Sequence, residues 1–490
     1  MLNLHAPAEN GDFRQVKAYI ELDPEPDYRH ASEEARQAFM DFKYGIRIHW
    51  GLYTLWNLQG ESWPFLRMSF SKRQAYQQLY QTFNPVDFDA GEWMDFFQKV
   101  GIRCMAFTSK HHEGFSMFDT AARVKRRINW TMRAGPQIED CDLAYSVMET
   151  PFKRDIVKEL CQAAQQRGIL IDLYFSHPDW YDADFRPYGF HPLQTQSVME
   201  RPEDYGDASY DQWVKSKFRS VLMSPERTPE ETVRMIQRHR TQLVELLSNY
   251  GKIDMLCLDI FLGKDVWPQM RETVKLLRQI QPDIMLRIRG IGNYGDYYTP
   301  EGFIPGDRGN TDMPWMVIYP LGKSFSYEPS GRRYKGARWI VRNLVDTVAK
   351  GGNFMPGIGP DATGRFHPQA IQNLEEAGEW LRVNGEAIYS TRPCDPWCDG
   401  PDIRFTRSKD GGCTYAIFLS WPGRRARIQA ARPVADARLT MLGVEKPLQW
   451  RNEASGVRIE IPEEIQKAEK RPCPFAWTVK IEGSVDFVKR

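Results

Sequence analysis

The chain has 490 residues, of which 65 are Lys or Arg and 64 are Asp or Glu, so it has no strong net charge to attract nucleic acid or an anionic membrane. The length exceeds what one hydrophobic core usually supports, so we expect one large and one smaller domain. The first residues, MLNLHAPAENGDF, lack the basic and apolar regions of a secretory signal, and no window reaches the roughly 18 apolar residues of a membrane span. We expect a cytoplasmic protein, or a secreted one if a signal was removed, with a neutral partner.

Seven short apolar segments alternate with helical patterns between about residues 40 and 390. The segments are 44–50, 102–109, 169–176, 253–260, 284–289, 314–319 and 352–358. Their continuous apolarity is typical of strands covered on both faces, as in a parallel sheet. Residues 155–168 and 231–251 have apolar residues at helical spacing and end at Gly. No G-x-G-x-x-G follows the first segment, so the pattern favours an α/β fold with a (β/α)8-like barrel over an open doubly wound sheet.

The sequence pattern changes after about residue 392. Residues 403–421 contain two short alternating segments joined by Lys-Asp-Gly-Gly, which predicts a β-hairpin. We therefore expect a catalytic barrel domain over 1–392, followed by a C-terminal antiparallel β-sandwich over 393–490. Residues 120–150 and the Pro-rich residues 177–230 are expected to be long barrel loops, which is where such enzymes build substrate pockets.

Polar and aromatic side chains are concentrated where the predicted strands end, and barrel enzymes place their active sites at that end. These residues are His49, Trp50, Lys110, His111, His112, Glu113, Tyr174, His177, Trp180, Asp259, Arg287, Arg289 and Trp315. Any one of them could be structural, for example a histidine that caps a strand. Asp259 is the clearest candidate, because an apolar strand would deliver its carboxylate to the barrel mouth. The alternative is an aspartate that only caps the following turn.

The neighbouring histidines His111 and His112 do not predict a metal site. Adjacent residues on a strand point to opposite faces, so both cannot easily bind one ion, and the chain has no H-E-x-x-H helix. We expect no metal and no cofactor. Hydrogen bonds from at least one of these histidines to substrate hydroxyls are the simpler interpretation.

Taken together and in order, these segments resemble glycoside hydrolase family 29, the retaining α-L-fucosidases. FKYGIRIHWGLYTLW (42–56) is similar to the family's K-F-G-I-F-I-H-W-G-x-Y-S, AFTSKHHEGFSMFDT (106–120) to its L-T-x-K-H-H-D/E-G-F, and DMLCLDIF (254–261) to its nucleophile strand D-x-x-W-x-D-G. Further similar segments are 172–180, 295–305, 351–366, 379–393 and 415–422. The resemblance covers about residues 40 to 425.

The resemblance implies a retaining exo-glycosidase that releases terminal α-L-fucose, or a closely related α-L-sugar, through a glycosyl-enzyme on Asp259. The residues that would bind the sugar or line its pocket are His49, Trp63, His111, His112, Tyr174, Arg289 and Trp315. The partner would be a fucosylated oligosaccharide or glycoside, with no nucleic acid and no membrane. Whether the chain forms a homo-oligomer is left open.

The chain departs from the family motifs at several positions. In the nucleophile strand, the motif's Trp is Cys257 and the Gly after the aspartate is Ile260, and near the first strand S-E-W is replaced by Glu61-Ser62-Trp63. Together with the loss of the motif's glutamate at position 316, these changes keep two alternatives open. One is a catalytically impaired fucose-binding protein, and the other is a hydrolase of a different L-sugar such as L-galactose.

The departure with the largest chemical consequence is at the sixth predicted strand. The family's P-W-E, whose Glu is the acid/base in many members, is Pro314-Trp315-Met316 in this chain. Methionine cannot donate a proton. Glu301 and Glu61 are therefore the candidates for the acid/base, with Asp312 as a third carboxylate near the motif and a helix-start role as the alternative for Glu301.

Overall fold

The computed structural model describes residues 3–5, 16–132, 136–193, 225–306 and 311–488. Within them, seven parallel strands form one curled sheet in the order β7-β6-β5-β2-β1-β9-β8. The strands are β1 (Gly45–Ile48), β2 (Cys104–Lys110), β5 (Leu170–Ser176), β6 (Met255–Asp259), β7 (Met285–Leu286), β8 (Met316–Pro320) and β9 (Asn353–Ile358). Each of them overlaps one of the seven predicted segments, so the predicted strands of the barrel are confirmed.

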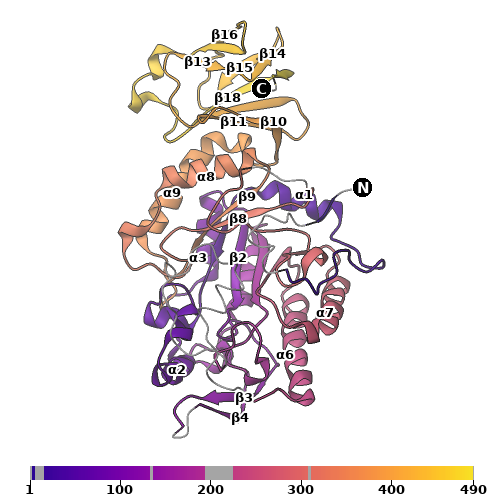
Figure 1. The fold of residues 1–490 in the computed structure, drawn as a ribbon. Coiled ribbons are helices and arrows are strands. Elements are labelled where there is room, and N and C mark those ends of the chain that lie inside the picture. Colours follow the sequence, from indigo (N-terminus) through magenta and orange to yellow (C-terminus); the bar gives the residue numbers. More distant parts are fainter. Residues whose placement is uncertain (1–2, 6–15, 133–135, 194–224, 307–310, 489–490) are drawn as a thin grey trace.

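The helices of this part of the chain lie around the sheet and at its two ends (Figure 1). They are α1 (Glu33–Phe42), α2 (Phe70–Gln77), α3 (Ala90–Lys99), α4 (Ile156–Gln166), α6 (Pro229–Ser248), α7 (Trp267–Ile280), α8 (Ala337–Ala349) and α9 (Pro368–Asn384). Their starts follow from local chemistry. Asp155 accepts a hydrogen bond from the backbone of Lys158 at the start of α4, and Thr228 forms a capping box with Glu231 at the start of α6.

The two edge strands of the sheet, β7 and β8, are joined by residues 296–302. Ile288 N donates to Tyr297 O at 3.1 Å on the β7 side, and Met316 N donates to Tyr298 O at 3.1 Å on the β8 side. These residues therefore occupy the eighth position of the barrel. The apolar pattern did not predict a strand here, because the segment contains Asp296, Pro300 and Gly302 and has no aliphatic residue.

The interior of the barrel is apolar near the amino ends of its strands. Alternate residues point inward, and a buried cluster there contains Cys104, Met255, Met285, Met316 and Met355. Phe39 and Phe42 of α1 belong to the same cluster and cover this end of the barrel. Position 316, where the family motif has its glutamate, thus lies in the apolar floor of the barrel.

The chain after α9 forms antiparallel sheets that lie beyond α8 and α9 (Figure 1). The strands are β10 (Thr391–Asp399), β11 (Ile403–Ser408), β12 (Cys413–Phe418), β13 (Arg425–Ile428), β14 (Ala431–Pro433), β15 (Arg438–Met441), β16 (Gln449–Asn452), β17 (Val457–Glu460), β18 (Trp477–Glu482) and β19 (Val485–Phe487). Strands β11 and β12 pair at the predicted hairpin. Trp380 Nε1 donates to Ala476 O at 2.8 Å and connects α9 to these sheets. The predicted domain boundary at residues 392 and 393 falls inside β10.

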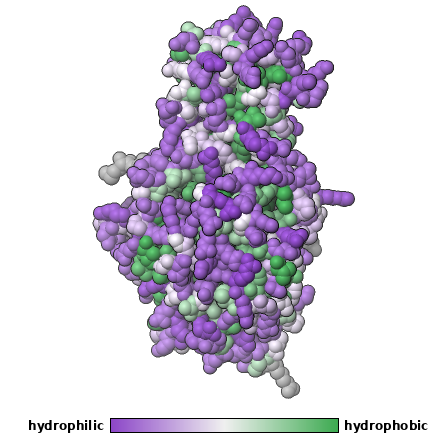
Figure 2. Space-filling model, turned by 180° about the vertical axis from the view of Figure 1, so that it is seen from behind, coloured by the Kyte–Doolittle hydropathy of each residue, from purple (hydrophilic) through white to green (hydrophobic). Residues whose placement is uncertain are grey.

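The segment predicted as a loop over 120–150 is partly regular. It contains the antiparallel hairpin of β3 (Val124–Asn129) and β4 (Gln137–Leu143), in which charged residues are frequent. Of the second predicted loop, 194–224 lies outside the described residues. In the described part of the chain, no helix is long and apolar enough to cross a membrane. The surface seen from behind is mostly hydrophilic, with apolar residues in separate small patches (Figure 2).

Candidate active site

A cavity of about 150 Å³ opens at the carboxyl ends of the barrel strands. Its lining residues are Arg47, His49, Glu61, Trp63, His111, His112, Tyr174, Asp259, Ile260, Arg287, Arg289, Glu301, Ile318 and Phe325. The residues predicted from the sequence to act on or bind a substrate are in this set, except Trp315 and the third candidate carboxylate, Asp312. The volume is below the roughly 300–1,000 Å³ of pockets for drug-sized ligands, and suits a ligand no larger than one sugar ring.

Asp259 is the last residue of β6, and its carboxylate is held from two sides. Tyr174 Oη donates to Oδ2 at 2.7 Å, and Arg289 Nη1 donates to Oδ1 at 2.8 Å. Arg287 Nη1 lies 3.8 Å from the same Oδ1. Burial alone would raise the pKa of Asp259, but the charges of Arg289 and Arg287 outweigh it and hold the pKa well below its usual range. The Asp259 carboxylate is therefore ionised at neutral pH.

Glu301 shares its arginine with Asp259. Arg289 Nη2 donates to Glu301 Oε2 at 2.7 Å, so the two nitrogens of one guanidinium hold two different carboxylates. The side chain of Glu301 is 43% exposed, whereas that of Asp259 is 10% exposed. The backbone of Glu301 pairs with Ile318 of β8 in the segment that closes the barrel. Asp259 thus lies deep in the cavity and Glu301 at its mouth.

Three histidines surround the deep end of the cavity in the neutral form. Burial lowers the pKa of His49 and His111 well below the usual value, and lowers the pKa of His112 to about 4. Ser62 Oγ lies 2.5 Å from His111 Nδ1, and His112 Nε2 lies 4.0 Å from Asp259 Oδ2. A neutral imidazole both donates and accepts a hydrogen bond, which suits the binding of hydroxyl groups. In the described part of the chain, no group of three or more His, Cys, Asp or Glu could hold a metal ion.

Two further glutamates lie at or behind the cavity wall, and both are protonated more readily than usual. Burial raises the pKa of Glu61 to about 7 and the pKa of Glu113 to about 8. Glu61 Oε1 accepts a hydrogen bond from Ser326 N at 2.8 Å, and the charge of nearby Glu301 raises its pKa further. Glu61 lines the cavity, whereas Glu113 does not.

These raised pKa values predict that stability falls as the pH rises. The unfolded carboxyl ionises near pH 4.5, but Glu113 in the folded protein stays protonated up to about pH 8. Its stabilising contribution is complete below pH 4.5 and is lost as the pH rises through 8, with about 1.4 kcal/mol for each unit of pKa shift. We expect Glu113→Gln to show a smaller fall in melting temperature between pH 5 and pH 8 than the wild type. An equal fall in both proteins, measured by thermal denaturation, would contradict the raised pKa.

Four of the side chains that line the cavity are apolar. They are Trp63, Ile260, Ile318 and Phe325. Trp63 packs against His112, with ring centroids 4.8 Å apart. Ile260 follows Asp259 directly and has a φ of 63°, a left-handed backbone conformation that is unfavourable for a β-branched residue. These side chains can make apolar contacts with the carbon atoms of a bound ligand.

Trp315 does not line the cavity, so this prediction from the sequence is wrong. On β8, Met316 and Ile318 belong to the buried cluster inside the barrel. Trp315 instead packs on the ring of Tyr298 and against Gly352. Adjacent residues of a strand face opposite sides, which explains the placement. Asp312 is also absent from the lining residues, and its Oδ2 accepts from Asn3 N at 2.8 Å.

Sequence reasoning missed four residues of the lining as site residues: Arg47, Ile260, Ile318 and Phe325. Arg47 lies two residues before His49 on β1, so strand alternation could have placed it on the same inward face. Phe325 lies in the loop after β8 and carries no recognisable signal in the sequence.

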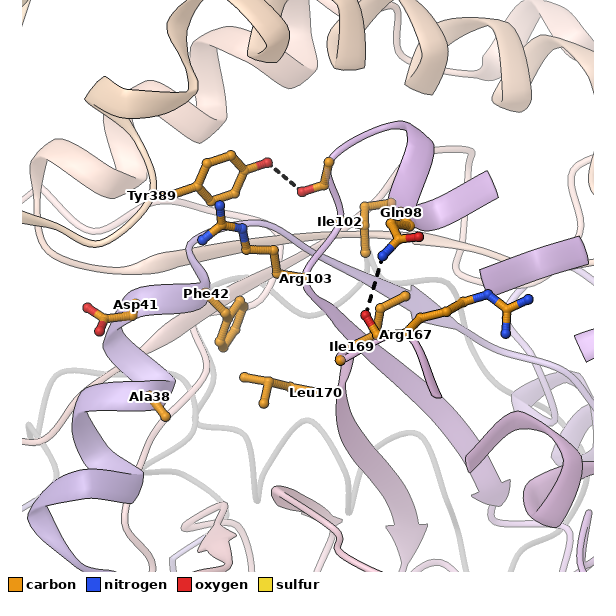
Figure 3. Close-up of a pocket in the computed structure, with 12 residues that line it drawn as sticks. Ala38, Asp41, Phe42, Gln98, Ile102, Arg103, Arg167, Ile169, Leu170 and Tyr389 are labelled. Atoms are coloured by element: carbon orange, nitrogen blue, oxygen red, sulfur yellow. Dashed lines mark hydrogen bonds between the residues drawn. The ribbon is translucent and has the colours of Figure 1, made fainter. Parts of the chain in front are cut away.

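A second hollow, of about 520 Å³, lies at the opposite end of the barrel, where β2 and β5 begin (Figure 3). Its polar groups are largely engaged with each other and with neighbours. Tyr389 Oη donates to Gly101 O, Gln98 Nε2 donates to Arg167 O, and the Arg103 guanidinium lies 3.5 Å from the centroid of the Tyr389 ring. Functional sites of barrels lie at the carboxyl ends of the strands, so the smaller cavity is the candidate site.

The carboxyl-end cavity of this barrel holds a deep ionised carboxylate, a second carboxylate at the mouth and a ring of neutral hydrogen-bonding groups. Two carboxyl groups that flank a small polar pocket define the class of glycoside hydrolases. A sequence model of the α-L-fucosidase family matches residues 17–386, and a model of the α-L-fucosidase C-terminal domain matches residues 399–482. The chain belongs to the α-L-fucosidase family.

Individual relatives agree over nearly the whole chain. The plasma α-L-fucosidase of Homo sapiens is 28% identical over 481 residues, which cover 93% of this chain and 92% of the relative. The tissue α-L-fucosidase of Homo sapiens is 26% identical over 485 residues, which cover 94% and 91%.

Solved structures have the same fold. The α-L-fucosidase isoenzyme 1 from Paenibacillus thiaminolyticus superposes with a TM-score of 0.69 at 25% identity, over 92% of this chain and 99% of that one. A GH29 α-L-fucosidase from Bacteroides thetaiotaomicron, described as a trapped covalent intermediate, superposes with a TM-score of 0.70 at 19% identity, over 95% and 100%.

Proposed function

We propose that the protein is a retaining exo-α-L-fucosidase in which Asp259 is the nucleophile and Glu301 is the acid/base. The observation that carries the assignment is the single guanidinium of Arg289, which donates to both carboxylates at 2.8 and 2.7 Å. Retaining glycosidases need two carboxyl groups only about 5–5.5 Å apart, and a span bridged by one guanidinium is compatible with so short a separation.

In the first step, a carboxylate oxygen of Asp259 attacks the anomeric carbon of the fucosyl group. The bond from that carbon to the glycosidic oxygen breaks, and Glu301 gives its proton to the departing oxygen. In the second step, Glu301 takes a proton from water, and the water oxygen attacks the anomeric carbon. The ester bond to Asp259 breaks, fucose leaves with its original configuration, and both carboxyl groups return to their starting states.

The exposure of the two candidates favours Glu301 over Glu61 as the acid/base. A leaving group and an incoming water must both reach this residue, and Glu301 is the more exposed of the two at the cavity mouth. Glu61 is only 7% exposed and accepts from the backbone of Ser326. With a pKa of about 7, Glu61 is often protonated at neutral pH and can donate a hydrogen bond to a sugar hydroxyl.

The alternative of a catalytically impaired binding protein was motivated by Met316. Because Met316 lies in the apolar floor, the residue at this position does not decide whether a carboxylate faces Asp259. Glu301 supplies that carboxylate from the neighbouring barrel segment. Release of nitrophenol from an aryl α-L-fucoside would support the hydrolase, whereas tight fucose binding in calorimetry with no turnover of any fucoside would favour the binding protein.

The apolar residues of the lining predict a preference for a 6-deoxy sugar. The methyl group of fucose can lie against Trp63, Ile260, Ile318 or Phe325, whereas the extra hydroxyl of L-galactose would be buried against carbon. An apolar pocket discriminates against an added hydroxyl by about 10²-fold. We expect kcat/KM for an aryl α-L-fucoside to exceed that for the matching α-L-galactoside by about this factor. Equal values, or a preference for the galactoside, would identify the protein as a hydrolase of a different L-sugar.

A further inference from the structure

A layer of buried charged and polar side chains forms the bottom of the cavity, where Arg47 and Arg287 line it, and continues directly beneath it. Its members are Arg47 on β1, Asp172 on β5, Cys257 on β6 and Arg287 after β7, and each is at most 1% exposed. Each of these residues precedes a cavity residue by two positions, namely His49, Tyr174, Asp259 and Arg289. Since side chains two apart on a strand share a face, the layer supports the residues of the cavity.

The contacts of this layer converge on the thiol of Cys257. Arg47 Nη2 donates to its sulfur at 2.8 Å, and Arg287 Nη1 donates to it at 3.1 Å. The charge of Asp172 also acts on both arginines, and burial raises the pKa of this carboxyl to about 6. Two guanidinium groups inside the barrel thus donate hydrogen bonds to one sulfur, and the charge of a buried carboxyl group acts on both.

Two members of the layer replace aromatic residues of the family motifs. Position 47 is Phe in K-F-G-I-F-I-H-W-G, and position 257 is Trp in D-x-x-W-x-D-G. In this chain the two side chains touch each other through the hydrogen bond from Arg47 to the sulfur. The substitutions at positions 47 and 257 therefore form one structural change, which places the positive charge of Arg47 at the bottom of the cavity.

This cation acts on the residue above it. Arg47 Nε donates to His49 Nε2 at 3.3 Å, and because arginine has no acceptor, this nitrogen of the imidazole must accept. The neutral ring then carries its proton on Nδ1. Among the residues that the structure describes, this buried Nδ1 has no hydrogen-bond partner, while the His49 side chain lines the cavity.

We propose that Arg47 is a positioning residue that fixes His49 in the Nδ1–H tautomer, so that the imidazole offers a preset donor to a hydroxyl group of the bound sugar. The identity of the sugar rests on the proposed function, but the tautomer does not. Cys257 and Arg287 hold Arg47 in place for this role.

The first test measures the tautomer of His49 directly. In a protein labelled with ¹⁵N-histidine, the signals of His49 are identified by their loss in His49→Ala. We expect the Nδ1–H form in the wild type and in Arg47→Lys, which keeps a cationic donor. In Arg47→Met we expect a different tautomer or a mixture of the two. An unchanged Nδ1–H signal in Arg47→Met would overturn the proposal.

The second test reads the effect on binding. We expect Arg47→Met to weaken the binding of L-fucose, measured by calorimetry, by about tenfold, as for the loss of one hydrogen bond. Combined with His49→Ala, the same substitution is expected to add almost nothing, because Arg47 acts through His49. Additive losses in this double-mutant cycle would contradict the proposal and indicate a merely structural role.

A matched control is Arg240→Met on α6, where the guanidinium donates to Thr273 Oγ1 at 3.0 Å outside the barrel. It should leave both the tautomer and fucose binding unchanged. If aryl fucosides are not hydrolysed but the tautomer depends on Arg47 as expected, the proposed function fails while the positioning role stands.

Discussion

Asp259→Asn is expected to lower kcat for an aryl α-L-fucoside by about 10⁴-fold or more. The amide keeps the size of the side chain but cannot attack the anomeric carbon, and the loss of a covalent nucleophile has effects of this order in other hydrolases. The measurement is the release of nitrophenol under steady-state conditions. Tyr174 and Arg289 lose a charged acceptor in the variant, so thermal denaturation must accompany the kinetics.

Asp254→Asn is the matched control for this prediction. Asp254 lies just before the amino end of β6, where its Oδ2 accepts from Ile171 N at 2.9 Å, far from the carboxyl-end cavity. Its substitution should affect stability more than kcat. Equal rates for Asp259→Asn and the wild type would remove Asp259 from the mechanism.

Glu301→Gln is expected to separate substrates by their leaving groups. For a natural fucoside, whose leaving oxygen needs a proton, kcat/KM should fall by about 10²–10⁴-fold. For an aryl fucoside with a strongly acidic phenol, the first step needs little protonation, so kcat/KM should change by less than about tenfold. Because water is then poorly activated, the glycosyl-enzyme should accumulate, and kcat and KM should both fall.

Azide provides an independent measurement on the same variant. It attacks the glycosyl-enzyme without needing a base, so it should restore turnover of the aryl fucoside and yield an α-L-fucosyl azide. Glu61→Gln is the comparison, since Glu61 lines the same cavity but is enclosed. If Glu61→Gln rather than Glu301→Gln shows this leaving-group dependence and azide rescue, the acid/base assignment must move to Glu61.

The strands of the barrel could be predicted from the sequence because they are buried on both faces. Segments such as 169–176 and 253–260 are mostly apolar without alternation, which is typical of parallel strands covered by helices. The eighth position could not be predicted in this way. Residues 296–302 make barrel hydrogen bonds with a composition typical of a turn, so only their tertiary partners reveal the role.

The core of the site could be predicted because strand ends meet at one face of a barrel. That rule places Asp259, Tyr174, Arg289 and the three histidines together. It failed for Trp315, since strand alternation points this side chain away from the cavity. For Met316, the sequence pattern does not show whether the side chain lies in the apolar floor of the barrel or at the carboxyl ends of the strands, where the cavity opens.

The role of Glu301 illustrates the remaining gap. The sequence offers three carboxylates as acid/base candidates, namely Glu301, Glu61 and Asp312. A structural role at the start of a helix is the alternative for Glu301. Its relation to Asp259 depends on Arg289, whose two nitrogens reach both carboxylates only in the closed barrel. A pairing between residues 42 positions apart, mediated by a third side chain, leaves no local pattern.

The proposed mechanism requires a covalent bond between the sugar and Asp259. The most direct test is to incubate the protein with 2-fluoro-fucosyl fluoride, the reagent described for the trapped Bacteroides thetaiotaomicron intermediate, and to map the labelled peptide by mass spectrometry. We predict one fluorofucosyl group per chain, attached to Asp259. A label on another carboxylate, or turnover of fucosides by a protein that the reagent neither labels nor inactivates, would contradict the proposed mechanism.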